Sequence, residues 1–169
     1  MQDLQGLKDE RGIRINEVGI ADFKVPLFIK SGRKKQQVLV DLKMGINLFA
    51  QNRGAHMSRF AEIAEKIRNS QLGRPLFIAG LKDLKRRMDV DYAKMEISFT
   101  YFLTKITPVS KKTCTANYEC KNASEMDRDN LIWNYFEITV PIATLCPCSK
   151  AISRYGAHNQ RAEILFKMK

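Results

Sequence analysis

The segment that decides the fold is Met95-Glu-Ile-Ser-Phe-Thr-Tyr-Phe-Leu103, where apolar residues occupy every second position over nine residues. Successive side chains of a β-strand point to opposite faces, so this alternation predicts a strand with one buried face. It is the cleanest strand pattern in the chain. We therefore predict a strand over 95–103 and interpret the flanking segments around it.

Two amphipathic helices are predicted before this strand. From Met57 to about Asn69, apolar residues recur at intervals of three and four, and Ser58 is a candidate N-cap. A second helix is predicted after Gly73-Arg-Pro75. Its apolar face comprises Phe77, Leu81, Leu84 and Met88.

Further strands are predicted on both sides of the helical pair. Segments 23–29 and 37–44 precede the helices and are expected to form a hairpin. Segments 115–121 and 131–143 follow strand 95–103 and are separated by a polar loop over 122–130; segment 162–168 is the last strand. The order β-β-α-α-β-β, followed by β, loop, β, predicts an α+β fold in which two helices cover one face of an antiparallel sheet.

The composition indicates a globular protein with a polyanionic partner. Of its 169 residues, 44% are hydrophobic, and the net charge is +11. Such a charge favours nucleotide phosphates, nucleic acid or an acidic surface as the partner. No apolar stretch approaches the roughly 20 residues of a membrane span, so we expect a cytoplasmic location without membrane association. There the cysteines are expected to be reduced.

The segment from Cys146 to Arg161 carries the densest chemistry. It contains Cys146-Pro-Cys148 and, twelve residues after the first thiol, His158. Thiolate and neutral imidazole are ligands of zinc-type sites, whereas a bare Cys-x-Cys pair is weak evidence. Spacing favours metal binding and leaves open a redox or nucleophilic cysteine or an inert pair. A catalytic zinc needs about three protein ligands, so one must come from elsewhere.

A second polar segment, Arg53-Gly-Ala-His-Met-Ser-Arg-Phe60, leads into the first predicted helix. Free N–H groups at a helix start, beside His56 and Arg59, would suit a phosphate or a carboxylate. The alternative is that His56 caps the helix and Arg59 is a solvated surface charge. The basic runs at 30–35, 82–87 and 111–112 are not interleaved with aromatic residues, which disfavours a nucleic-acid partner.

The two polar segments together resemble the signature segments of the GTP cyclohydrolase type IB family. The resemblance includes Gly-Ala-His-Met-Ser-Arg-Phe (54–60) and Leu-Cys-Pro-Cys-Ser-Lys-Ala-Ile-Ser-Arg-Tyr-Gly-Ala-His-Asn-Gln-Arg (145–161). Segments 11–20 and 101–110 resemble the family's intervening blocks. The resemblance covers nearly the whole chain.

The resemblance implies the tunnelling fold, in which each unit has the order β-β-α-α-β-β. Family members carry two units in tandem and assemble, usually as homotetramers, with sites at interfaces. The implied organisation is a first unit over 1–125 and, over 126–169, the opening hairpin of a second unit, which is expected to be incomplete at Lys169.

The resemblance also implies a reaction, the conversion of GTP to 7,8-dihydroneopterin triphosphate and formate, which begins folate-type pterin synthesis. It implies a divalent metal (zinc, manganese or ferrous iron) held by Cys146 and His158, with Cys148 as a neighbour. The expected catalytic residues are Cys146 and His56, the latter for proton transfer or a phosphate contact. Expected triphosphate contacts are Arg59, Lys150 and Arg161. Two alternatives stay open: an archaeal-type cyclohydrolase with a cyclic-phosphate product, and a non-catalytic nucleotide- or nucleic-acid-binding module with a structural metal.

Overall fold

The computed structural model describes residues 10–169, which form six strands and three helices. Residues 1–9 of the expected first unit, and with them its first boundary, lie outside the described residues. The elements in chain order are β1 (Ile15–Ser31), β2 (Lys34–Leu48), α1 (Met57–Ile67), α2 (Arg74–Met88), β3 (Ala93–Ile106), β4 (Thr113–Met126), β5 (Ile132–Leu145), α3 (Pro147–Ile152) and β6 (Asn159–Met168).

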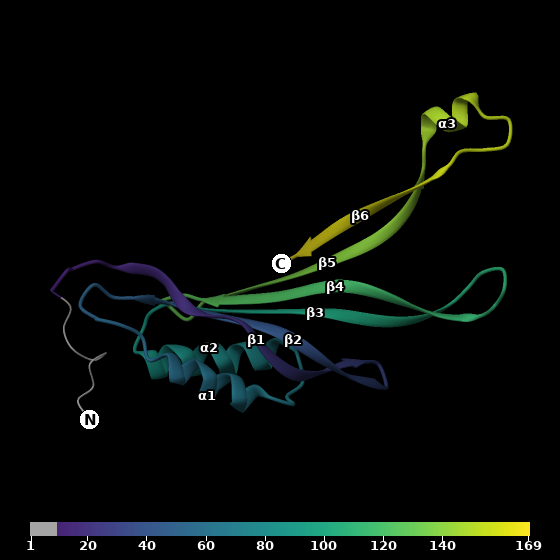
Figure 1. Ribbon diagram of the computed structural model, residues 1–169. Coiled ribbons are helices and arrows are strands. Elements are labelled where there is room, and N and C mark those ends of the chain that lie inside the picture. The colour runs from purple at the N-terminus through teal and green to yellow at the C-terminus, as the bar shows by residue number, and fades with distance from the viewer. Residues whose placement is uncertain (1–9) are drawn as a thin grey trace.

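All six strands lie in one antiparallel sheet in the order β1-β2-β3-β4-β5-β6. Helices α1 and α2 lie side by side against one face of this sheet (Figure 1). The structure confirms the predicted α+β architecture with two helices on one face. We call the face covered by α1 and α2 the helical face, and the opposite one the open face.

The core lies between the helical face and the two helices. Alternate residues of β2 and β3 point into it, because the side-chain period of a strand is two. Leu42 on β2 and Ile97 on β3 are cross-strand neighbours and fully buried. The helices contribute residues at helical spacing, and the largest of these are also fully buried: Phe60, Ile63, Phe77, Leu81 and Leu84.

Strand β4 extends through half of the segment predicted as a polar loop. The loop prediction over 122–130 is wrong for residues 122–126, which pair with β3 and β5. One polar residue there is satisfied across the sheet, since the Ser124 hydroxyl donates to Asn134 Oδ1. Ser124 is fully buried. Polarity thus marked a cross-strand hydrogen bond rather than a turn; the turn itself is shorter and lies between Met126 and Ile132.

The start of α1 also differs from the predicted one. Helix α1 begins at Met57 with His56 as its N-cap residue, so the prediction of Ser58 as N-cap is wrong. The extended backbone of His56 (φ −75°, ψ 91°) sets this start, and its side chain makes no capping hydrogen bond. Helix α3 begins at Pro147, because proline suits the first helical position, where no N–H is needed.

The helices leave the β5–β6 hairpin uncovered (Figure 1). It curves away from β4 and carries α3 at its far end (Figure 1). Every residue of β6 is exposed. On the helical face its apolar residues Ile164, Phe166 and Met168 are 39%, 49% and 56% exposed. The expected boundary between residues 125 and 126 lies at the end of β4, where the sheet continues into β5 without a break.

Candidate functional site

The far end of the β5–β6 hairpin is built by a short helix and a turn between two long strands. The ladder between the strands continues to the pair Leu145 and Asn159. The thirteen residues between them include α3, which starts at Pro147 directly after Cys146. Gly156 has a φ of +113°, a conformation that side-chain-bearing residues rarely adopt, and so lets the chain return toward β6.

Cys146 and His158 face each other where the two strands open into this turn. The Cys146 N–H donates to the His158 carbonyl at 3.3 Å, which extends the strand pairing by one more residue pair. The Cys146 thiol caps α3, because its Sγ accepts the Ser149 N–H at 3.5 Å. Cys146 is half-buried and His158 is exposed. The structure therefore brings together the backbones of the two predicted metal ligands.

The other predicted residues of this segment lie around the pair. Cys148 and Lys150 are exposed on α3, and the Lys150 N–H donates to the Cys146 carbonyl at 3.0 Å. Arg161 on β6 pairs with Ala143 on β5 and lies on the open face. There it lines a shallow cavity of about 630 Å³. Arg161 thus offers a guanidinium beside a hollow near the turn.

Within residues 10–169, no three side chains of the types His, Cys, Asp and Glu are close enough to hold a metal ion together. Cys146 and His158 supply a soft and a borderline donor, which fits a transition-metal ion. Two donors fall short of the three protein ligands of a catalytic zinc. The described part of one chain therefore supplies a partial donor set.

The second polar segment lies at the start of α1. His56 is half-buried there, and its carbonyl accepts the Arg59 N–H at 3.0 Å. The Arg59 guanidinium donates to the Arg87 carbonyl in the last turn of α2. Arg59 thus satisfies a carbonyl at a helix C-terminus, a structural role that its sequence neighbours did not indicate.

The two polar segments lie at opposite ends of the sheet. Ile46, Ala93, Met126 and Ile132 are successive cross-strand neighbours and mark one end. The Arg59–Arg87 contact belongs to this end, since α2 leads directly into Ala93. From Ile132, β5 runs thirteen residues to Leu145, and at about 3.3 Å per residue that is roughly 43 Å. A site that used both segments would need two copies of the chain.

The open face of the sheet carries a set of cross-strand ion pairs that the sequence analysis missed. Lys121 contacts Glu96 at 2.8 Å, and Lys167 contacts Glu137 at 2.6 Å. The hydrogen bond from Lys167 holds the pKa of Glu137 below its ordinary value. The sequence pattern that could have revealed this polar face is the alternation within β3. There Lys94, Glu96 and Ser98 alternate with the buried residues Ala93, Met95 and Ile97.

A half-buried tyrosine, Tyr135, extends this polar face. The Tyr135 hydroxyl donates to Glu125 Oε1 at 3.0 Å. Burial, followed by that hydrogen bond, raises the pKa of Tyr135 to about 12. Tyr135 therefore keeps its proton at neutral pH and acts as a hydrogen-bond donor rather than as a base.

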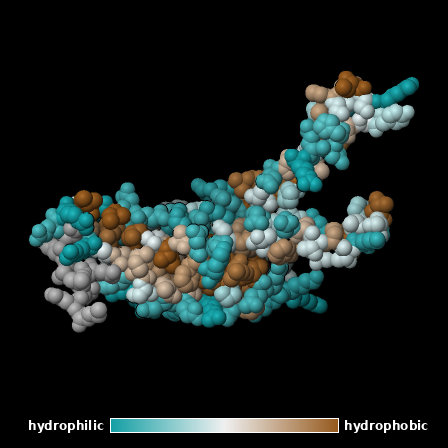
Figure 2. All heavy atoms as spheres, viewed as in Figure 1, coloured by the Kyte–Doolittle hydropathy of each residue, from teal (hydrophilic) through white to brown (hydrophobic). Residues whose placement is uncertain are grey.

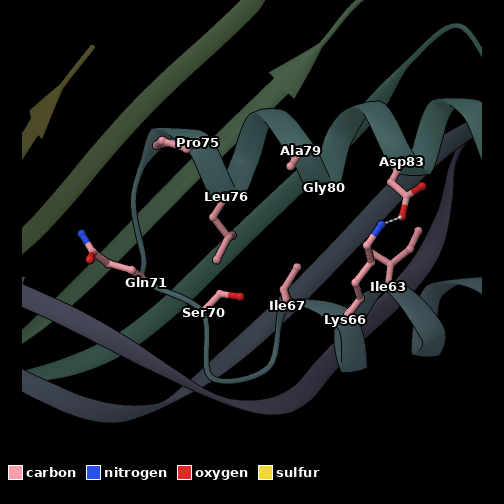
Figure 3. Close-up of a pocket in the computed structure, with 10 residues that line it drawn as sticks. All are labelled: Ile63, Lys66, Ile67, Ser70, Gln71, Pro75, Leu76, Ala79, Gly80 and Asp83. Atoms are coloured by element: carbon pink, nitrogen blue, oxygen red, sulfur yellow. Dashed lines mark hydrogen bonds and ion pairs between the residues drawn. The ribbon is translucent and has the colours of Figure 1, made fainter.

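A cavity of about 330 Å³ lies between α1 and α2, away from both polar segments (Figure 3). Apolar residues of the two helices form its walls, and the Lys66–Asp83 ion pair (3.1 Å) closes one end. Burial raises the pKa of Asp83, but hydrogen bonds from Arg86, Lys66 and Arg87 outweigh it and hold that pKa below its ordinary value. None of the six predicted site residues lines this cavity.

Comparison with known proteins identifies the family. The family model described as type I GTP cyclohydrolase folE2 matches residues 1–169. The chain belongs to this GTP cyclohydrolase family. In the described part of the chain, no helix combines the length and the apolar character that crossing a bilayer requires.

Three relatives within the family are 35–39% identical to this chain. The GTP cyclohydrolase FolE2 of Thermosipho africanus is 39% identical over 163 residues, which cover 96% of this chain and 62% of the relative. That of Syntrophobacter fumaroxidans is 35% identical over 97% of this chain and 64% of its own length. GTP cyclohydrolase FolE2 2 of Cupriavidus metallidurans is 37% identical over 99% and 62%. The chain thus spans less than two thirds of the length of these relatives.

Proposed function

We propose that this chain is the part of a GTP cyclohydrolase that carries the reactive thiol and imidazole. The proposed reaction converts GTP to 7,8-dihydroneopterin triphosphate and formate, the first step of folate-type pterin synthesis. Family membership supports the substrate and the reaction. The observation that carries the proposal for these residues is the hydrogen bond between the Cys146 N–H and the His158 carbonyl, which juxtaposes the two residues.

Cys146 and His158 are proposed as two ligands of a divalent metal: zinc, manganese or ferrous iron. The metal would supply the Lewis acidity needed for hydrolysis at C8 of the purine. A further ligand has to come from outside residues 10–169 or from another subunit, because the described part of the chain offers no third donor nearby. Cys148, exposed on α3, is a neighbour and not a ligand in this proposal.

The remaining residues are assigned to the substrate. Lys150, four residues after Cys146, and Arg161, three residues after His158, are proposed to contact the triphosphate. His56 is proposed to transfer protons or to contact a phosphate, and Arg59 to add a further phosphate contact. Since these last two lie at the opposite end of the sheet, the proposal requires that they belong to another subunit. This requirement agrees with the proposed assembly as a homotetramer. The proposed location of the assembly is the cytoplasm.

Two measurements test the proposal separately. Binding of Co²⁺ to the 169-residue chain, followed by the thiolate-to-metal absorption band, tests the ligands. We expect the band to disappear in Cys146→Ala and to persist in the matched control Cys148→Ala. Formate release from GTP by a protein that contains the chain, supplied anaerobically with each of the three metals, tests the reaction. No formate with any metal would refute the function, and an unchanged band in Cys146→Ala would refute the ligand.

A further inference from the structure

Two acid-free segments carry most of the excess positive charge. Residues 28–40 contain four basic residues (Lys30, Arg33, Lys34 and Lys35), and residues 99–118 contain three (Lys105, Lys111 and Lys112). Together they account for seven charges, against a net charge of +11 for the whole chain. All seven are exposed, and none is in an ion pair with any residue of 10–169. Solvated surface lysines normally alternate with acids, so this segregation indicates an anionic partner.

The fold places the two segments beside each other around a cleft. The β2–β3 ladder extends only from the Asp41–Ser98 pair to the Ile46–Ala93 pair. Beyond it the β1–β2 and β3–β4 hairpins diverge, as Figure 1 shows. The space between them is a cleft of about 360 Å³, lined by Lys34 and Lys35 on one side and by Phe102 and Thr104 on the other.

Aromatic rings lie among these cations in space, although they do not in sequence. Phe102 in the cleft is 51% exposed. The Lys35 ammonium lies 3.7 Å from the centre of the Phe28 ring, and the Lys105 ammonium 5.2 Å from that of Tyr118. Cross-strand pairing creates both contacts. Aromatic residues are thus absent from the basic runs along the sequence but present beside the lysines in the folded protein.

The surface is longer than one phosphate group can span. Ile106, the last residue of β3, lies four residues beyond Phe102, about 13 Å at 3.3 Å per residue. Lys111 and Lys112 lie further on, in the turn before β4. Apolar and polar side chains occur together at the end of this hairpin (Figure 2). A linear polyanion can contact both the cleft and the turn at once.

We propose that the cleft and the adjoining β3–β4 turn bind a single-stranded nucleic acid. Phosphates would lie against Lys34 and Lys35 in the cleft and against Lys111 and Lys112 at the turn. One base would stack on the exposed ring of Phe102, as bases do on aromatic residues of single-strand binding grooves. The site is separate from Cys146 and His158, which lie on a different hairpin.

The proposed contacts between phosphates and lysines are tested by fluorescence anisotropy. The measurement uses a labelled oligouridylate of about twelve nucleotides and the 169-residue chain. Each phosphate contact on a single strand contributes a slope of about −0.7 in log K against log salt. Lys34→Gln/Lys35→Gln should reduce the slope by about 1.4 and weaken binding about 25-fold at 0.1 M salt. The matched control Lys82→Gln/Arg128→Gln removes two exposed cations elsewhere and should change neither. Equal losses in both double variants would overturn the proposal.

The proposed stacking of a base on Phe102 is tested by substitutions of that residue. Phe102→Ala should weaken binding about five- to hundredfold, and Phe102→Leu, which keeps the apolar surface, should also weaken it. Trp133→Ala removes an aromatic residue of similar exposure (50%) from β5 and should have no effect. Displacement of the oligonucleotide by polyglutamate, by GTP or by anionic vesicles at equal charge concentration would show an acidic chain, a free nucleotide or a membrane as partner, and would overturn the proposal.

Discussion

The helix-covered part of the sheet and the β5–β6 hairpin have the same alternating strand pattern but opposite surroundings. In β2 and β3 the apolar residues of the helical face are buried against α1 and α2. In β6 the equivalent residues, such as Phe166, are about half exposed. Yet the thiol and imidazole of the candidate site are on the exposed hairpin. The comparison teaches that the stability of this chain and its proposed chemistry reside in different parts of one continuous sheet.

The sharpest test of this separation is Cys146→Ala. We expect formate release from GTP to fall by about a thousandfold or more, because the variant loses a proposed metal ligand. The midpoint of urea unfolding should change little, since Cys146 is only half-buried and lies outside the core. Cys148→Ala, two residues further along the chain, is the control and should retain most of the turnover. A large loss of stability in Cys146→Ala would contradict the separation.

The core side of the comparison is tested by two phenylalanines. Phe77 on α2 is 0% exposed, whereas Phe166 on β6 is 49% exposed. Phe77→Ala should lower the free energy of unfolding by about 3–5 kcal/mol through lost burial and a new cavity. Phe166→Ala should lower it by less than about 1 kcal/mol. Urea titrations followed by circular dichroism measure both, and similar losses would mean that the hairpin is buried in solution.

The Asp83 cluster predicts a pH dependence that belongs to the helix-covered part. Asp83 is held below its ordinary pKa by Arg86, Lys66 and Arg87, which outweigh the effect of burial. A carboxyl with a lowered folded-state pKa contributes stability above its unfolded pKa of about 3.9, and this contribution is lost as the pH falls through the folded value.

Asp83→Asn should therefore cost about 1–3 kcal/mol at pH 7, because it leaves three cations without their carboxylate. The variant should lose less stability than the parent between pH 5 and pH 2. Unfolding free energies across that range measure the difference. Parallel pH curves for the two proteins would contradict the assigned cause.

The smallest effect is expected for the exposed Arg68–Glu65 pair at the end of α1. Its atoms are 2.8 Å apart, but both side chains are more than half exposed. An exposed helical pair of this spacing contributes about 0.2–0.5 kcal/mol. Glu65→Gln should therefore shift the unfolding midpoint only slightly, and 1 M salt should remove the shift. A larger effect would indicate that α1 is covered in solution.

Local periodicity was sufficient to predict the architecture, because each element has its own apolar repeat. The strand predicted over 95–103 lies within the longer β3, and the helix predicted from Met57 to about Asn69 is α1, which ends at Ile67. The errors came from polar residues whose partners are distant in sequence. Ser124 and Asn134 bond across the sheet, so the loop predicted at 122–126 is a strand.

The candidate site was predicted less completely than the fold. The proximity of Cys146 and His158 could be predicted because both residues belong to one short segment of the sequence. The structure shows a hydrogen bond between their backbones. Arg59 could not be placed, because its contact with Arg87 depends on how α1 and α2 pack. The aromatic neighbours of the lysines in residues 28–40 and 99–118 depend in the same way on strand register, which a linear reading does not contain.

Helices α1 and α2 lie between β2 and β3 in the sequence, and this order affects the kinetics of folding. The other strand pairs join neighbours in sequence through connections of at most thirteen residues and can form early. Pairing β2 with β3 instead closes a loop that contains both helices, and its ladder has only six residue pairs. We therefore expect docking of the β1–β2 hairpin to be the slow step of folding, with high φ-values for core residues of α2, the helix that packs against both β2 and β3.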